Sequence, residues 1–149
     1  MLPDMLSHLI EEKGYRCAYN YIYYSAMYNT KNPFLIKLLQ LLNPYPVYIE
    51  IEVTTRCNLR CIMCEHTYWK EKSQDMPFKD FKMIVDQFPH LIWIGLTGIG
   101  ESFMNKDFLK MLRYVKSRKI SVELFDTFYF IDNEIGQEIQ RTGQYQVQL

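Results

Sequence analysis

The stretch that decides the fold is VYIEIEVTTRCNLRCIMC, residues 47–64. Its first seven residues alternate apolar and polar side chains, which is the two-residue period of a β-strand with one buried face. Directly after this strand come Cys57, Cys61 and Cys64, three of the chain's four cysteines. Thiols clustered in this way outside a disulfide framework predict metal binding or redox chemistry in the loop that follows the strand.

Downstream of the cysteines, helical and strand periods alternate along the chain. The expected helices cover residues 81–88, 108–115 and 132–142, and the expected strands cover residues 91–97, 120–125 and 145–149. Strict β-α alternation with right-handed crossovers builds a parallel sheet, either a barrel or a doubly wound layer. The sequence therefore predicts an α/β fold.

Residues 1–46 have a different, helical character. We expect helices over residues 3–13 and 15–28 and a short helix that begins near Asn32. Three tyrosines of the middle helix recur at i, i+3 and i+7 and so share one face: Tyr21, Tyr24 and Tyr28. That face predicts either internal packing or docking on a neighbouring domain. We expect two units, an N-terminal helical segment of residues 1–46 and a βα unit of residues 47–149.

Composition excludes several function classes. The chain has 149 residues, 48% of them hydrophobic, and a formal net charge of zero, which is typical of a modest globular domain and argues against nucleic-acid binding. Its longest apolar stretch, residues 34–42, contains Lys37 and is too short to span a membrane. The N-terminus lacks the pattern of a secretory signal, so we expect a cytoplasmic protein with reduced thiols.

A second unusual loop, GIGESF, covers residues 98–103 and follows the strand predicted at residues 91–97. In parallel α/β folds, ligands bind where the carboxyl ends of neighbouring strands meet. We therefore expect the cysteine loop and this loop to lie at one edge of the sheet and to form a shared site.

Three thiolates can hold two kinds of metal centre. A cubane [4Fe–4S] cluster held by three cysteines keeps one iron open for a small molecule. Alternatively, His66 completes a Cys₃His zinc site, although a single residue separates Cys64 from His66, a tighter spacing than is usual in structural zinc sites. Both interpretations use Cys57, Cys61 and Cys64.

CNLRCIMC resembles the CxxxCxxC signature of the radical SAM enzymes, with Cys57, Cys61 and Cys64 at the three cluster-binding positions. GIGESF is similar to the glycine–glutamate motif that follows the family's second strand. The resemblance implies an enzyme that binds a 4Fe-4S cluster and S-adenosyl-L-methionine and cleaves the latter reductively to a 5′-deoxyadenosyl radical. It also implies a flavodoxin- or ferredoxin-type electron donor and a small-molecule or peptide substrate.

The resemblance further implies roles for four residues. Gly98 and Gly100 would let the backbone approach the methionyl end of the cofactor, and Glu101 would face its ammonium group. The backbone of Met63 would lie near the adenine. Without the resemblance, the glycines predict a tight strand-to-helix turn, and Glu101 predicts a charge at a helix start.

Four charged residues lie close to the cysteines in the sequence. Glu50 and Glu52 share the polar face of the first strand, and we expect this face to point into the open interior of the half-barrel. Arg56 and Arg60 flank Cys57, where they either offset the charge of a cluster or lie solvated at the surface.

The resemblance covers about the first half of a barrel that usually has six βα units. The expected fold is thus a partial parallel (βα) barrel preceded by an N-terminal helical segment, and we expect the chain to be a fragment or a truncated reading frame. The sequence also departs from the family pattern at Asp126, Thr127 and Phe128, after the third strand. A noncatalytic remnant that keeps the cluster loop is therefore an alternative to the enzyme.

Overall fold

The centre of the fold is a parallel sheet of four strands. The computed structural model describes residues 7, 10–11, 14–42, 45–127, 129–142 and 145–148. Neighbouring strands pair in the order in which they occur in the chain: β1 (Tyr48–Glu50), β2 (Trp93–Gly95), β3 (Ser121–Phe125) and β4 (Tyr145–Gln148). This arrangement confirms the α/β fold predicted from the alternating periods.

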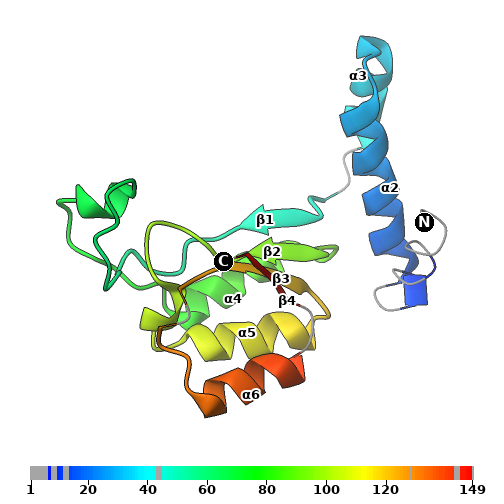
Figure 1. Cartoon of the computed structure of the whole chain (residues 1–149). Coiled ribbons are helices and arrows are strands. Elements are labelled where there is room, and N and C mark those ends of the chain that lie inside the picture. The colour runs from blue at the N-terminus through cyan, green and yellow to red at the C-terminus, as the bar shows by residue number, and fades with distance from the viewer. Residues whose placement is uncertain are drawn as a thin grey trace.

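Helices join each strand to the next and lie on one face of the sheet (Figure 1). They are α4 (Phe78–Asp86), α5 (Phe108–Ser117) and α6 (Asn133–Thr142). Two short 3₁₀ helices, η1 (Glu65–Thr67) and η2 (Ser102–Met104), occur in the loops after β1 and β2. Three consecutive crossovers on the same side give the curved start of a partial barrel.

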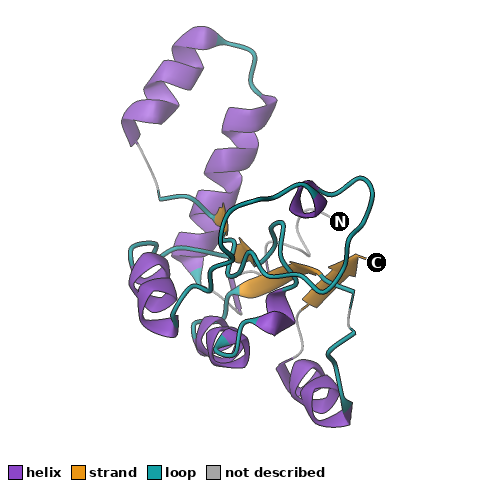
Figure 2. Cartoon of the chain, turned by 90° about the vertical axis from the view of Figure 1, so that its left-hand side faces the viewer, coloured by secondary structure: helices purple, strands orange, loops and turns teal. Residues whose placement is uncertain are grey.

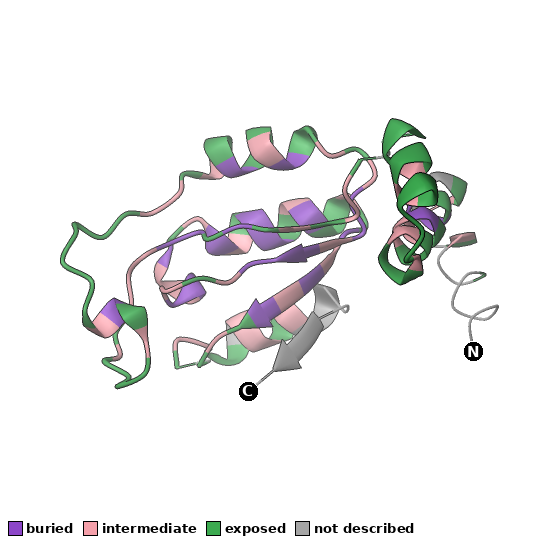
Figure 3. Cartoon of the chain, turned by 90° about the horizontal axis from the view of Figure 1, so that it is seen from above, coloured by how far each residue is buried: buried purple, intermediate pink, exposed green. Residues whose placement is uncertain are grey.

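The hydrophobic core lies between the sheet and helices α4 and α5 (Figure 3). Ile51 and Val53 supply the apolar half of the first strand's alternation, and both are buried. Phe81 of α4 and Phe108 of α5 are among the largest fully buried side chains. Each such side chain stabilises the fold by about 1.5–3 kcal/mol relative to an exposed one, so this layer holds the strand ends in place.

Glu50 and Glu52 alternate with the core residues of the same stretch and are exposed. They lie on the face opposite α4 and α5, where the two-residue period predicts them. Strand β1 is shorter than the strand predicted over residues 47–53. One backbone hydrogen bond, from Ile51 N to Gly95 O at 2.8 Å, extends its pairing with β2 by one residue. Beyond that point the chain leaves β2, and Thr54 forms an antiparallel bridge with Asp75.

Two helices, α2 (Tyr15–Asn29) and α3 (Pro33–Leu42), form a hairpin at the amino ends of the strands (Figure 1). The ring of Tyr21 lies 5.9 Å from that of Trp93 on β2, and Ala18 packs against Ile92. The predicted helix over residues 3–13 falls mostly outside the described residues, as do Gly143 and Leu149. The division between residues 1–46 and 47–149 stays a prediction.

Among the described residues, every helix is too short or too polar to cross a lipid bilayer.

Candidate functional site

The cysteine loop has a fixed base. Thr54 donates its hydroxyl to Asp75 Oδ1 at 2.7 Å, and Arg56 meets the same carboxylate through Nε at 2.9 Å and through Nη2 at 2.7 Å. A two-pronged guanidinium–carboxylate pair fixes orientation as well as distance. The long loop between these residues arches over the carboxyl edge of the sheet, which faces the viewer in Figure 2. Asp75 thus closes a loop that begins and ends at the sheet.

Asn105 strengthens this base from the loop after β2. Its side-chain amide is buried and donates to Val53 O at 2.7 Å and to Met76 O at 2.9 Å. Both donors of one amide are therefore used to hold together the two ends of the cysteine loop. No local sequence signal marks Asp75 or Asn105, because both lie far along the chain from the cysteines that they support.

The three cysteines lie on the exposed part of this loop. Cys64 N donates to Cys61 O at 3.0 Å, which closes a four-residue turn and brings the two Cα atoms within about 7 Å of each other. Cys57 Sγ accepts a bond from Leu59 N at 3.4 Å. All three thiols are free; that of Cys61 belongs to an exposed residue, and the other two residues are half-buried.

The donor set fits an iron–sulfur cluster in number and chemistry. Three reduced, solvent-accessible thiols on one loop can ligate three irons of a cubane. Among the described residues, no three Cys, His, Asp or Glu side chains converge on a common metal position. Ligand loops of metalloproteins commonly close only when the metal binds, so binding of a cluster would bring the three thiols together above a base that is already fixed.

His66, the residue considered for zinc, is buried in η1. It lines a cavity of about 350 Å³ together with Cys57, Arg60 and Trp69. Within the described part of the chain, its Nδ1 atom has no hydrogen-bond partner. A buried imidazole nitrogen without a partner is costly, and a metal ion is one group that would satisfy it.

The second loop touches the first through its backbone. Glu101 N donates to Arg56 O at 2.7 Å. A Cβ atom on Gly100 would lie 2.1 Å from Thr54 O and 2.8 Å from Arg56 O, distances that no real side chain tolerates. Close packing therefore explains why glycine occupies position 100: the two loops approach too closely for any residue with a side chain.

Gly98 and its neighbour contact the polar face of the first strand. Ile99 N donates to Glu52 Oε1 at 2.5 Å, and a Cβ atom on Gly98 would lie 2.1 Å from the same oxygen. Here the obstacle is the end of a flexible side chain, so the restriction is weaker than at Gly100. Glu52 thus holds the glycine loop as well as facing the open interior.

Glu101 is buried at the mouth of the sheet. Its Oε1 atom accepts bonds from Thr127 N at 3.0 Å and from the Thr127 hydroxyl at 2.7 Å. Thr127, one of the departures from the family pattern, is therefore the residue that orients Glu101. Met63, by contrast, is 91% exposed on the cysteine loop, and its place beside an adenine stays a prediction, as do the cofactor roles of Gly98, Gly100 and Glu101.

Comparison with known proteins places this geometry in context. Over 99 residues the chain is 34% identical to the tungsten-containing aldehyde ferredoxin oxidoreductase cofactor-modifying protein of Pyrococcus furiosus, and the match covers 64% of this chain and 28% of that protein. It is 23% identical over 106 residues to the mycofactocin maturase MftC of Mycobacterium tuberculosis, and this match covers 70% of this chain and 27% of MftC. No family model matches the chain.

A solved structure has the same architecture. BtrN, in complex with AdoMet and 2-DOIA, superposes with a TM-score of 0.60 at 18% identity, over 70% of this chain and 45% of BtrN. The chain is related to the radical SAM superfamily. Its four strands correspond to a partial radical SAM barrel, and it spans less than a third of the length of the curated relatives it matches.

Proposed function

We propose that this chain binds a 4Fe-4S cluster through Cys57, Cys61 and Cys64 and binds S-adenosyl-L-methionine at the adjoining loop that contains Glu101. One observation carries the proposal: the bond from Glu101 N to Arg56 O, at 2.7 Å, fixes the glutamate loop beside the start of the cysteine loop. Because both loops leave neighbouring parallel strands, their side chains serve the same edge of the sheet.

When bound, the two cofactors would supply an electron and a sulfonium whose reductive cleavage gives methionine and a hydrogen-abstracting 5′-deoxyadenosyl radical. The chain's own residues would position them. The carboxylate of Glu101, oriented by Thr127, offers a negative charge for the ammonium group of the methionyl end. The ion pair of Arg56 with Asp75 would hold the cysteine loop in position, and Arg56 lines the same cavity as Cys57.

The relatives support a wider proposal about partners. One is named as a cofactor-modifying protein and another as a maturase, so we propose a small-molecule or peptide substrate. The electron would come from a reduced flavodoxin- or ferredoxin-type donor. Such chemistry needs reduced thiols, which favours the cytoplasm.

Anaerobic reconstitution with iron and sulfide tests the cluster. We expect broad brown absorption, about four irons per chain by the composition of a cubane, and a change in the electron paramagnetic resonance spectrum of the reduced protein when S-adenosyl-L-methionine is added. Substitution of any one of Cys57, Cys61 and Cys64 by serine should abolish stable iron loading. A protein that takes up no iron, or whose three variants load as well as the parent, would contradict the proposal.

Glu101 and Thr127 test the cofactor loop separately. Thr127→Val removes the hydroxyl that donates to Glu101, so we expect weaker binding of S-adenosyl-L-methionine, by about tenfold for one hydrogen bond to a charged group, with iron content unchanged. Thr127→Ser keeps the hydroxyl and should bind like the parent. Equal affinities of the valine and serine variants would exclude this positioning role.

His66 favours a second candidate, a structural zinc module. Its buried, unpartnered Nδ1 and the Cys61–Cys64 turn are features that a zinc site would use. Protein purified in the presence of both iron and zinc distinguishes the cluster from the zinc module. One zinc ion per chain, no brown colour, and loss of the zinc in His66→Ala would favour the zinc module.

A further inference from the structure

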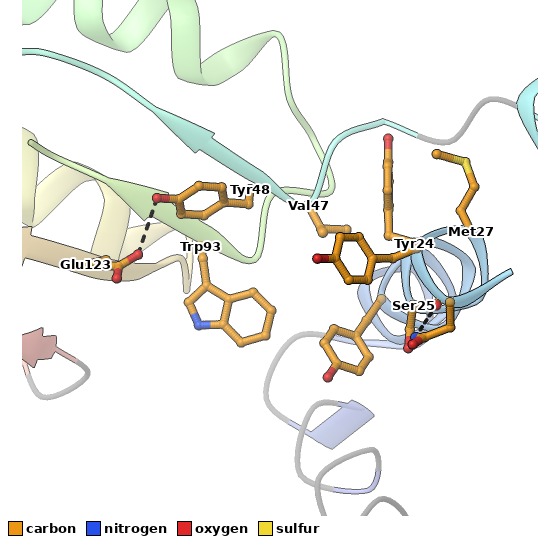
Figure 4. Close-up of a pocket in the computed structure, with 10 residues that line it drawn as sticks. Tyr24, Ser25, Met27, Val47, Tyr48, Trp93 and Glu123 are labelled. Carbon is orange, nitrogen blue, oxygen red and sulfur yellow. Dashed lines mark hydrogen bonds between the residues drawn. The ribbon is translucent and has the colours of Figure 1, made fainter. Parts of the chain in front are cut away.

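A second cavity lies at the opposite edge of the sheet from the cysteine loop. It has a volume of about 820 Å³ and lies between helix α2 and the amino ends of β1, β2 and β3 (Figure 4). Tyr21, Tyr24 and Tyr28, the three residues predicted to share a helical face, line its helix side. Because the strands separate this cavity from the loops at their carboxyl ends, it is distinct from the proposed cofactor site.

Half of the residues that line the cavity are aromatic. Trp93 projects from β2 toward the tyrosines of α2, and its ring centroid lies 5.9 Å from that of Tyr21 at an interplanar angle of 58°. The faces of tyrosine and tryptophan rings attract cations within about 6 Å of their centroids, and several rings around one space form the cage that recognises organic ammonium groups. The wall is therefore suited to a cation with an apolar stem.

One carboxylate, Glu123, lies on the polar side of this cavity. Tyr48 lies with its hydroxyl 2.7 Å from Glu50 Oε1 and 3.3 Å from Glu123 Oε2. A phenol has one proton, so it can satisfy only one of these two acidic neighbours at a time. Glu123 lines the cavity, and among its described lining residues there is no lysine, arginine or histidine. The site has an excess of negative charge.

We propose that this cavity binds an organic cation, a protonated amine or guanidinium carried on an apolar stem. The rings of Tyr24, Tyr28 and Trp93 would cover the stem and the faces of the cation, and Glu123 would pair with its charge. The same chemistry is offered by a free alkylamine or guanidine and by a lysine or arginine side chain of a peptide. Binding of a cation in this cavity would not require that the cysteine loop hold a cluster.

Calorimetric titration of the whole chain tests the proposal. The probes are the N-acetyl, N-methylamide derivatives of lysine and arginine, the neutral norleucine derivative, and a short neutral peptide with one central lysine. We expect saturable binding of the cations, weakened by added salt, with a shift of the Trp93 indole N–H resonance. Binding of the free derivatives indicates a small-molecule ligand; binding of the peptide alone indicates a peptide partner. Equal binding of norleucine, or no saturable binding of any cation, would overturn the proposal.

Two variants localise the effect. Glu123→Gln should weaken binding of the cations about tenfold, because the charge pair with the half-buried carboxylate is lost. Glu65→Gln, which removes an exposed carboxylate of the cysteine loop, is the matched control. Tyr28→Ala should weaken binding about threefold, and since Tyr28 is 91% exposed, its removal leaves the fold intact. Tyr15→Ala, 79% exposed on the same helix and outside the cavity, is its control. Affinities unchanged in both test variants would overturn the proposal.

Discussion

The backbone N–H of Glu101 donates to the carbonyl oxygen of Arg56 at 2.7 Å, one residue before Cys57. This bond joins two loops that are separated by a whole βα unit in the sequence. Because it uses backbone atoms only, it depends on how closely the chains approach and not on the identity of either side chain. A change that separates the two loops should therefore affect the cysteine loop and Glu101 together.

Gly100→Ala is the change that tests this junction. The added Cβ would lie 2.1 Å from Thr54 O, a backbone atom that cannot rotate away. We expect the free energy of unfolding to fall by about 1–3 kcal/mol, as in other overpacked sites. Thermal or urea unfolding of the ligand-free chain measures the loss without any cofactor.

Gly98→Ala is the matched control for that experiment. The obstacle there is the Glu52 carboxylate, which can move at the cost of its bond to Ile99 N. We expect the loss of stability in Gly98→Ala to be the smaller of the two. If Gly98→Ala proves the more destabilising variant, the two loops do not pack as described.

Asp75→Asn tests the base of the cysteine loop. The substitution removes the charge that holds Arg56 and weakens the acceptor of the Thr54 hydroxyl. Because Arg56 is partly exposed, we expect a loss of only about 1 kcal/mol in global stability. In Asp75→Asn, hydrogen exchange should nevertheless become faster in residues 55–74 while it stays unchanged in α5. Glu71→Gln, which removes an exposed carboxylate in the same loop, should leave exchange unchanged in both regions. Equal protection in both variants would show that Asp75 does not close the loop.

Much of the fold was predictable because its signals are local. The alternation from Val47 to Val53 assigns one strand face to the core, and the helical spacing of Phe108, Met111 and Val115 identifies the buried side of α5. The end of the β1 ladder was not predictable in this way. The chain leaves β2 because Thr54 bridges to Asp75, a contact between residues whose separation carries no periodic signal.

In the candidate site, too, features with a local sequence signal were predictable and long-range contacts were not. The Cys57–Cys64 spacing and the position of Glu101 after β2 could be read from the sequence, since each follows directly from its own strand. The partners of these residues could not. Thr127 reaches Glu101 from the loop after β3, and this contact exists only because parallel pairing brings three strand ends to one edge.

Asp86 links α4 to α5 and makes stability depend on pH. Hydrogen bonds from Lys82 and then Tyr114 lower the pKa of its carboxyl below the usual 3.8. A lowered pKa in the folded state stabilises the protein above the unfolded pKa, and this contribution disappears as the pH falls through the folded value. We expect Asp86→Asn to be less stable at neutral pH and to lose less stability than the parent when acidified below about pH 4. Asp80→Asn, on the exposed side of the same helix, is the control. Parallel acid profiles for the parent and Asp86→Asn would contradict this role.

Tyr48 makes stability depend on pH at the alkaline end. Its partial burial and its hydrogen bond to Glu50 raise the pKa of its hydroxyl above the usual 10.0. The folded state therefore holds the proton more tightly than the unfolded state, so this contribution is complete below pH 10 and decreases as the pH rises toward the folded pKa. We expect the parent to lose stability above about pH 10 and Tyr48→Phe, which has no phenol proton to lose, to lose less. Urea unfolding at a series of pH values from 8 to 11 measures the difference, with Tyr15→Phe, at an exposed position of α2, as control. If Tyr48→Phe follows the parent curve throughout, the phenol does not share its proton with the carboxylates of β1 and β3.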